Sequence, residues 1–188
     1  VALALVGATY ANGYVKNKVM EFVGPGVASL SADCRNGIDC MTTETTCWSS
    51  IWQTDGVTEE YLAGHGRADA YKELKPADVA YYDGCIELDL SKIECMIALP
   101  MHPSYAYPIR ELKANAKDLL HEIENRANEQ LSGKVKMDLV SKVRADGSIY
   151  VDQGIVAGCS GGTYENLCAV ADILRGKSCG NGEFKFSA

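Results

Sequence analysis

The chain has 188 residues, 47% of them hydrophobic, and a formal net charge of −7. This length allows one or two domains with a hydrophobic core, and the acidic balance argues against nucleic acid as a partner, because phosphate binding needs a basic surface. No stretch approaches the roughly 20 apolar residues of a membrane span, and residues 1–9 lack the basic flank and length of a signal peptide. We therefore expect a protein without a membrane partner.

Hydrophobic periodicity and turn residues predict alternating short helices and strands in the first half of the chain. The clearest pattern is the alternation from Tyr81 to Leu90, which is typical of a strand. Thr58 is expected to cap a helix that ends at Gly64. In chain order we expect the end of a helix at 1–6, a half-buried strand at 14–22, helices at 27–34, 58–64 and 67–74, and a strand at 81–90.

The second half begins with a continuous apolar strand that Pro100 ends. Two further prolines in residues 101–108 are expected to exclude regular structure there. In chain order we expect strand 93–99, an amphipathic helix at 109–132 stopped by Gly133, strand character at 135–144, a turn at 145–148, extended chain at 149–151, and a strand at 183–186. Helices alternating with strands predict the α/β class. A seam after Lys92 divides the chain into units 1–92 and 93–188.

Cys159 occupies the most informative position in the sequence. An apolar run ending near Ala157 predicts a buried strand, and the following glycines lead into a helix at 164–175, for which Thr163 is the expected cap. Cys159 thus follows a strand and precedes a helix N-terminus. That is where α/β sheets place ligands and where a helix dipole favours thiolate over thiol.

The other candidate features are less specific. The eight cysteines include no Cys-x-x-Cys pair, and a chain of this size can fold without disulfides, so a reduced, cytoplasmic setting is expected. Glu44 is a lone carboxylate among small polar residues, which suits either a loop acid or a functional group. Ala157-Gly-Cys-Ser-Gly matches a nucleophile elbow, but the histidines at 65, 102 and 121 all precede Cys159, whereas that fold places its histidine afterwards.

Several segments, in the same order and at similar spacing, resemble the aconitase family over nearly the whole chain. Val19-Met-Glu-Phe-Val-Gly-Pro-Gly-Val is similar to the strand and turn ahead of the family's Asn-Met-x-x-Glu segment, and Cys40-Met-Thr-Thr-Glu44 occupies that segment. Gly66-Arg-Ala-Asp and Tyr82-Asp-Gly-Cys-Ile-Glu-Leu-Asp-Leu-Ser follow. Gly158-Cys-Ser-Gly-Gly-Thr-Tyr-Glu-Asn stands where the family has Gly-Ser-Cys-Thr-Asn. The resemblance implies partial three-layer α/β/α units.

In that family three cysteine thiolates hold a [4Fe-4S] cluster that acts as a Lewis acid on a hydroxy di- or tricarboxylic acid, while a serine in another domain removes the carbon-bound proton. The resemblance implies that Cys159 is the first cluster ligand, with the other two in a downstream Cys-x-x-Cys. It also implies that Glu44 matches the family glutamate that contacts water or hydroxyl at the open iron. We expect a fragment of a hydro-lyase, completed by the remaining domains of its parent chain.

Such a fragment is expected to be inactive and cluster-free alone, because one thiolate cannot hold a cluster normally supported by three or four. Cys40 stands where the family has asparagine, and Ser160-Gly161 where it has Thr-Asn, both near cluster or substrate. These departures indicate a divergent branch with a substrate other than citrate or isocitrate. Two alternatives remain: a non-catalytic module that has lost the cluster and binds a partner or RNA, and a cysteine-nucleophile enzyme using Cys159.

Overall fold

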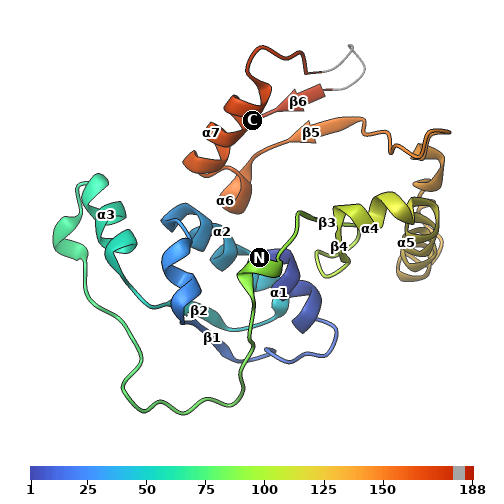
Figure 1. The fold of residues 1–188 in the computed structure, drawn as a ribbon. Coiled ribbons are helices and arrows are strands. Elements are labelled where there is room, and N and C mark those ends of the chain that lie inside the picture. The colour runs from blue at the N-terminus through green and yellow to red at the C-terminus, as the bar shows by residue number, and fades with distance from the viewer. Residues whose placement is uncertain (180–184) are drawn as a thin grey trace.

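In the computed structural model, which describes residues 1–179 and 185–188, short helices alternate with three small sheets (Figure 1). The α-helices are α1 (Ala2–Thr9), α2 (Ala32–Thr42), α3 (Gly56–Gly64), α4 (Ile109–Ala114), α5 (Ala116–Gln130), α6 (Gly158–Gly161) and α7 (Tyr164–Leu174). The strands are β1 (Val19–Phe22), β2 (Ser49–Trp52), β3 (Met96–Ala98), β4 (Ala106–Pro108), β5 (Gln153–Ile155) and β6 (Lys185–Ser187). Short 3₁₀ helices are η1 (Pro25–Ser29), η2 (Thr43–Thr45), η3 (Ala68–Ala70), η4 (Leu90–Lys92) and η5 (Val140–Lys142). The mixture confirms the α/β class.

The three sheets each contain two strands within the described part of the chain. β1 pairs with β2, and β5 with β6, in parallel, whereas β3 and β4 are antiparallel. α1 packs against both β3 and β4, and α2 packs against α1, β2 and α6. Elements from both sides of Lys92 are therefore in contact, and the division into units 1–92 and 93–188 stays a prediction. Within the described residues, no helix has the length and apolar character needed to cross a membrane.

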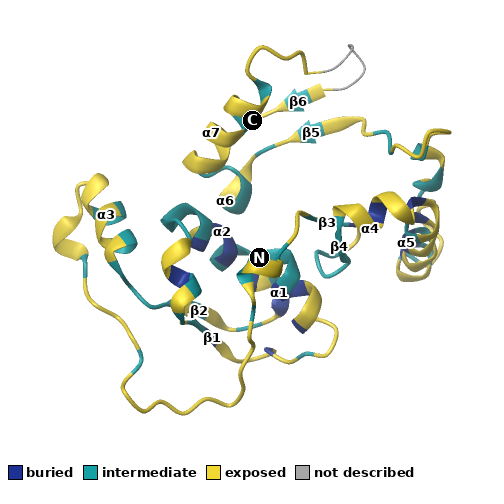
Figure 2. Ribbon diagram, in the orientation of Figure 1, coloured by how far each residue is buried: buried dark blue, intermediate teal, exposed yellow. Residues whose placement is uncertain are grey.

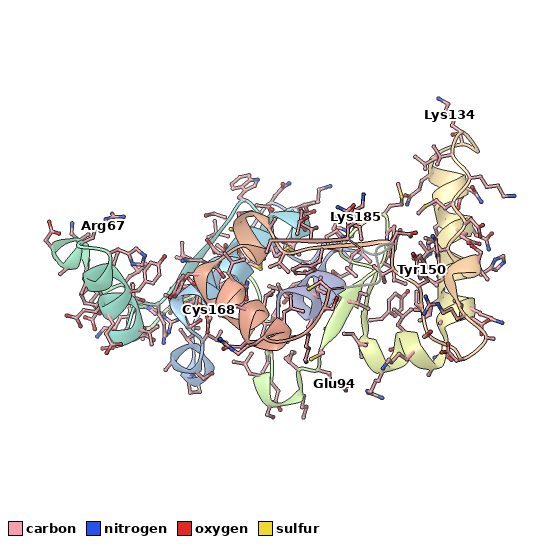
Figure 3. The ribbon with its side chains drawn as sticks, turned by 90° about the horizontal axis from the view of Figure 1, so that it is seen from above. Arg67, Glu94, Lys134, Tyr150, Cys168 and Lys185 are labelled. Carbon is pink, nitrogen blue, oxygen red and sulfur yellow. The ribbon has the colours of Figure 1, made fainter. Side chains whose placement is uncertain are left out.

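The molecule is open and elongated. Figure 3 shows Arg67, beyond α3, and Lys134, beyond α5, at opposite ends of the molecule. The accessible surface is 12521 Å², whereas a compact monomer of 20.3 kDa exposes about 8,800 Å². Figure 2 shows α3 and α7 mostly exposed, and neither helix contains a buried residue. Much apolar surface that a closed core would cover therefore faces solvent.

The buried hydrophobic side chains of the described residues include two small clusters. One contains Leu5 of α1, Val15 and Met20 of β1. The other contains Leu99, Leu112, Leu120 and Ile123. α5 contributes to it through one apolar face, because its buried residues recur every three or four positions.

The helix predicted at 109–132 is present but interrupted. Asn115, with φ −127° and ψ 29°, separates α4 from α5. α5 ends at Gln130, slightly before the predicted end at 132, and is followed by Ser132 and Gly133, which both adopt positive φ; the Gly133 amide donates to the Asn128 carbonyl at 2.9 Å. Gly133 is therefore confirmed as the stop signal.

The strand predicted at 81–90 is wrong. Residues 71–89, all described, contain neither helix nor strand. The segment is instead held beside β1 by side chains: the Tyr82 hydroxyl donates to the Glu21 carboxylate at 2.6 Å, and the Tyr14 hydroxyl contacts the Cys85 backbone N–H and carbonyl, both at 3.2 Å. Alternation identifies side chains that share a face, but it does not supply a neighbouring strand to pair with.

Three other predictions in the first half need correction. The helix at 1–6 is confirmed as α1, but the strand at 14–22 is limited to β1, because the chain turns at Gly13 and Asn17, which both have positive φ. The helix predicted at 27–34 is replaced by η1, and α2 begins only after Ser31, whose hydroxyl accepts from the Cys34 amide at 3.1 Å. At 67–74 only η3 forms.

The helix predicted at 58–64 is present as α3, but its cap is wrong. Asp55 rather than Thr58 occupies the N-cap, and its carboxylate accepts from the amides of Val57 at 3.1 Å and Thr58 at 3.2 Å. α3 therefore begins earlier than predicted, at Gly56. Both residue types can cap a helix. The Asp55 carboxylate is also held in place by two hydrogen bonds from the Arg35 guanidinium.

In the second half, the strand predicted at 93–99 is confirmed in part as β3. Residues 106–108, predicted to be irregular, form β4, whose last residue, Pro108, lies opposite Met96. Proline is tolerated there because an end position on an edge strand needs no amide donor. Residues 135–144 contain η5 rather than a strand, and extended pairing at 149–151 is limited to a bridge between Val143 and Ile149.

The remaining predictions concern a turn and the last strand. The turn at 145–148 is confirmed by the Arg144 amide, which donates to the Ser148 carbonyl at 2.8 Å. The last strand is β6, and residues 183 and 184 of the prediction lie outside the described residues.

Arg35 is the most buried charge in the described chain, with 4% of its surface exposed. Its guanidinium donates to both carboxylate oxygens of Asp55, at 2.9 and 2.7 Å, and to the carbonyls of Val27 and Leu30. The hydrogen bond from Arg35 lowers the pKa of Asp55, as do the amides at the start of α3. This pair connects α2 to η1 and α3.

We predict that Asp55→Asn destabilises the protein by about 3 kcal/mol, because asparagine keeps the helix cap but leaves the Arg35 charge buried without its partner. Folding lowers this carboxyl pKa, so the contribution of the pair is complete above the unfolded value of about 3.9 and is lost as pH falls through the lower folded value. Denaturant unfolding across the acid range measures both effects.

The matched control is Asp172→Asn, which removes one partner of an exposed pair with Arg175 on α7. Its cost should be about 0.5 kcal/mol or less. Equal losses in the two variants would contradict a special role for Arg35 and Asp55.

Candidate functional site

Cys159 lies between β5 and α7, as the sequence predicts, but within the additional short helix α6. The strand before it is predicted to be buried, whereas Gln153 and Ile155 of β5 are exposed, because within the described chain this sheet has only two strands and no helix covers this face of it. Gly158, with φ 84°, turns the chain from the strand into the helix, and the Cys159 side chain is exposed. α6 has only four residues, so its dipole is small. The expectation that a helix dipole favours the thiolate form of Cys159 is therefore not supported. Thr163 precedes α7 as predicted, but its hydroxyl is buried without a hydrogen-bond partner among the described residues, so it does not cap.

Residues at the N-termini of α2 and α7 form hydrogen bonds with each other. The Glu165 amide, in the first turn of α7, donates to the Asp33 carboxylate at 2.9 Å. In return, the Ser31 hydroxyl, at the N-cap of α2, donates to the Glu165 carboxylate. Acidic groups near a helix N-terminus satisfy free amides and oppose the helix dipole, so each helix stabilises the start of the other.

Gly37 lets α6 approach the middle of α2. The Ser160 hydroxyl donates to the Gly37 carbonyl at 3.0 Å, and the Asn166 side-chain amide donates to the Ser160 carbonyl at 3.1 Å. A Cβ atom on Gly37 would lie 3.3 Å from the Ser160 carbonyl oxygen, which is closer than most side-chain carbons tolerate. A side chain at this position would force the Ser160 carbonyl to move by a few tenths of an ångström, so glycine favours the observed close approach.

This packing brings Cys40 to Cys159, although the two are 119 positions apart. The Cys40 thiol donates to the Cys159 carbonyl at 3.7 Å. Burial, followed by a hydrogen bond with the Cys159 side chain, raises the pKa of Cys40. Cys159, Ser160 and Cys40 thus lie together, and the two thiols form one soft, sulfur-rich surface.

Glu44 continues this surface along the helix. Thr43, which follows the last residue of α2 and begins η2, keeps right-handed helical dihedral angles, so Cys40 and Glu44 are four residues apart on nearly continuous helical backbone and share a face. The Glu44 side chain is 44% exposed, and its Oε2 atom lies 3.7 Å from Nε2 of His102. The sequence predicts Glu44 as a candidate site residue, whereas no spacing in the sequence links His102 to it.

The three histidines all make contacts away from Cys159. The His65 ring contacts the Tyr61 carbonyl at 2.7 Å, the His121 ring lies 3.7 Å from the Glu124 carboxylate, and the His102 ring contacts Glu44 and Ser104. None of these contacts is with Cys159, so the alternative in which Cys159 acts as a nucleophile lacks a histidine of this chain as its general base. All eight cysteines are free thiols, and among the described residues no group of three or more His, Cys, Asp or Glu side chains is placed to hold a metal ion.

Comparisons with known proteins match this chain to one family. A family model described as "Aconitase family (aconitate hydratase)" matches residues 1–187. The 2,3-dimethylmalate dehydratase large subunit of Eubacterium barkeri is 30% identical over 158 residues, which cover 84% of this chain and 30% of that protein. The 3-isopropylmalate dehydratase large subunits of Caldicellulosiruptor bescii and Wolinella succinogenes are 28% and 30% identical, over 88% and 85% of this chain and 30% and 31% of those proteins. The chain thus spans about a third of the length of these curated relatives.

We predict that a short bifunctional thiol reagent such as dibromobimane cross-links Cys40 to Cys159 in the iron-free full-length protein. Gly37→Ala should slow this reaction several-fold, because its new methyl group pushes the Ser160 carbonyl, and α6 with it, away from α2. Peptide mapping by mass spectrometry measures the cross-link.

Gly64→Ala, at the exposed end of α3 where an added Cβ meets no atom within 4 Å, is the matched control and should leave the rate unchanged. Failure of Cys40 and Cys159 to cross-link in the parent protein would contradict their placement side by side.

Proposed function

This chain belongs to the aconitase family, and on that premise we propose that it forms part of an iron–sulfur hydro-lyase that reversibly dehydrates a hydroxy di- or tricarboxylic acid. The observation that supports the proposal is the meeting of Cys159, Cys40 and Glu44 on one surface, from segments far apart in the sequence. Thiols and a carboxylate are the two kinds of group that such chemistry needs: sulfur to hold iron, and oxygen to contact the reacting hydroxyl.

Cys159 is the residue that we propose as a ligand of a [4Fe-4S] cluster. Its thiol is exposed and follows a glycine turn, and the Cys40 thiol beside it makes the surroundings suitable for iron and sulfide. The donor set fits one side of such a cluster. The other two of the three thiolate ligands would come from parts of the enzyme outside these 188 residues, because the described residues contain no group of three or more side chains placed to hold a metal ion.

When bound, the cluster supplies a Lewis acid that eases departure of the substrate hydroxyl. The residues of this chain then have separate roles. Glu44, half-exposed on the face it shares with Cys40, is placed to hydrogen-bond to the departing hydroxyl or to the water that replaces it. Ser160 is committed to the Gly37 carbonyl, so it fixes the position of Cys159 rather than contacting substrate.

Cys40 places a thiol where the family has the side-chain amide of asparagine, and this difference favours a substrate without a third carboxylate. The matched relatives are named for 2,3-dimethylmalate and 3-isopropylmalate, which carry alkyl groups. A thiol is a weak hydrogen-bond donor and behaves as a small apolar group. We therefore propose an alkyl-substituted hydroxy dicarboxylic acid as the substrate class, rather than citrate or isocitrate.

We also propose that the chain alone does not turn over substrate. It has one side of the cluster site, and its accessible surface is far larger than that of a closed domain of its mass. The remaining domains of the enzyme would cover this surface, and the relatives, being large subunits, indicate a further subunit as well. Eight free thiols fit a reducing cytoplasm.

We predict that anaerobic reconstitution of the full-length protein with iron and sulfide yields about four iron atoms per chain and a broad sulfur-to-iron absorbance band. Cys159→Ala should lose most of both signals, because one of three thiolate ligands is gone. Cys168→Ala, an exposed cysteine on the nearby helix α7, is the matched control and should bind iron like the parent.

A cluster that forms equally well in Cys159→Ala would refute the ligand role of Cys159. No cluster in either protein would refute the hydro-lyase proposal and favour a family member that kept the fold as a binding module. Turnover of an alkyl-substituted malate by the loaded protein, tested beside citrate, then decides the substrate class.

A further inference from the structure

His102 lies at the Glu44 end of this surface and is held firmly for a loop residue. The loop between β3 and β4 is closed by two backbone hydrogen bonds, from the Leu99 amide to the Tyr105 carbonyl at 2.9 Å and from the Tyr105 amide to the His102 carbonyl at 3.0 Å. The imidazole stacks on the ring of Tyr10, just after α1, with centroids 3.9 Å apart and an interplanar angle of 25°. Its side chain is only 26% exposed.

Ser104 determines which ring nitrogen carries the proton. The Ser104 amide donates to Nδ1 of His102 at 3.1 Å, and the Ser104 hydroxyl lies 3.0 Å from the same nitrogen. An amide N–H can only donate, so Nδ1 must be the nitrogen with the free electron pair. The proton of the neutral ring is therefore on Nε2, the atom that faces the Glu44 carboxylate at 3.7 Å.

We propose that His102 is a positioning residue of the active site, whose Nε2–H group orients the Glu44 carboxylate. The proposal rests on the proposed function, in which Glu44 contacts the substrate hydroxyl. A separation of 3.7 Å is slightly longer than a hydrogen bond, and such contacts tighten when a ligand is bound. The structure thus assigns one carboxylate oxygen to His102 and leaves the other for the hydroxyl or water.

Orientation matters because an exposed glutamate samples several rotamers. Glu44 follows the last turn of α2 on a short 3₁₀ helix and makes its side-chain contact with His102 alone among the described ion pairs and hydrogen bonds. Losing that contact would leave the carboxylate free to swing away from the reacting atoms. Misplacement of a catalytic group by about 1 Å can cost about 100-fold in rate.

The pairing itself is tested without any activity measurement. Long-range ¹H–¹⁵N spectra of the iron-free full-length protein, recorded in mildly alkaline buffer with the rings of His65, His102 and His121 assigned, report which nitrogen of each neutral ring is protonated. We expect the Nε2-protonated form for His102, and we expect Glu44→Gln to shift the Nε2 resonance of His102 but not those of His65 and His121. Protonation on Nδ1, or an Nε2 resonance unmoved by Glu44→Gln, would overturn the proposal.

Two substitutions of His102 in the cluster-loaded full-length protein separate positioning from packing. His102→Phe keeps a ring to stack on Tyr10 but removes the donor, and we expect kcat to fall about 10- to 100-fold with KM changed by less than about threefold. His102→Gln loses the ring but can place an amide N–H near the position of Nε2, and it should recover most of kcat. His121→Phe, an exposed histidine on α5, is the matched control and should behave like the parent.

The reverse order, with His102→Gln more damaged than His102→Phe, would show that His102 acts only through packing and would overturn the proposal. An inactive parent protein with the NMR pairing intact would refute the proposed function and leave the pairing established. An active parent with no pairing would refute this inference and leave the proposed function standing.

Discussion

The contact between α2 and the α6–α7 segment is the constraint on which the candidate site depends. It has two parts: the exchange at the N-termini, where Asp33 and Glu165 each accept from the other helix, and the close approach of Ser160 to Gly37. The first satisfies an amide that would otherwise lack a partner at the start of α7, and the second sets the separation of the backbones. Cys159 and Cys40 meet because both parts hold at once. A site built from one helix could not combine these thiols, because they are separated by most of the chain.

The elements around this contact are weakly supported by the rest of the described chain. β5 and β6 form a two-stranded parallel sheet whose Ile155 side chain is 67% exposed, whereas parallel sheets are normally covered on both faces. α7 contains no buried residue. The segment that carries Cys159 is therefore positioned mainly by α2 rather than by a sheet core. Such an arrangement fits our proposal that further domains cover the exposed faces, and it explains why the accessible surface is so large.

Part of this arrangement follows from local sequence. The apolar run before Cys159, the glycines around it and the helical pattern at 164–175 predict a buried strand, a turn and a helix, and the structure has all three, although the strand is mostly exposed. Alternation at 81–90 fails because it identifies a face but not a pairing strand, and the cap at Thr58 fails because Asp55 caps and also binds Arg35. The pairing of Glu44 with His102 is beyond sequence reasoning, because it depends on a loop folded against α1. The nearness of Cys40 to Cys159 followed from family resemblance, since no spacing in the sequence indicates it.

The surface formed by Cys159, Cys40, Glu44 and His102 is chemically different at its two ends. At one end two sulfurs lie together, and at the other a carboxylate faces an imidazole whose proton position a backbone amide fixes. The single S–H group of Cys40 is already donated to the Cys159 carbonyl, so this position offers no strong donor to a ligand. A substrate carboxylate placed there would lose hydration without gaining a hydrogen bond, at a cost of a few kcal/mol, whereas an alkyl group would lose nothing. In our proposal, therefore, the presence of Cys40 where the family has asparagine has two effects. It contributes the second thiol to this surface, and it discriminates against a tricarboxylic acid. The second effect is strong because burying an unpaired carboxylate costs more than a contact with one methyl group gains.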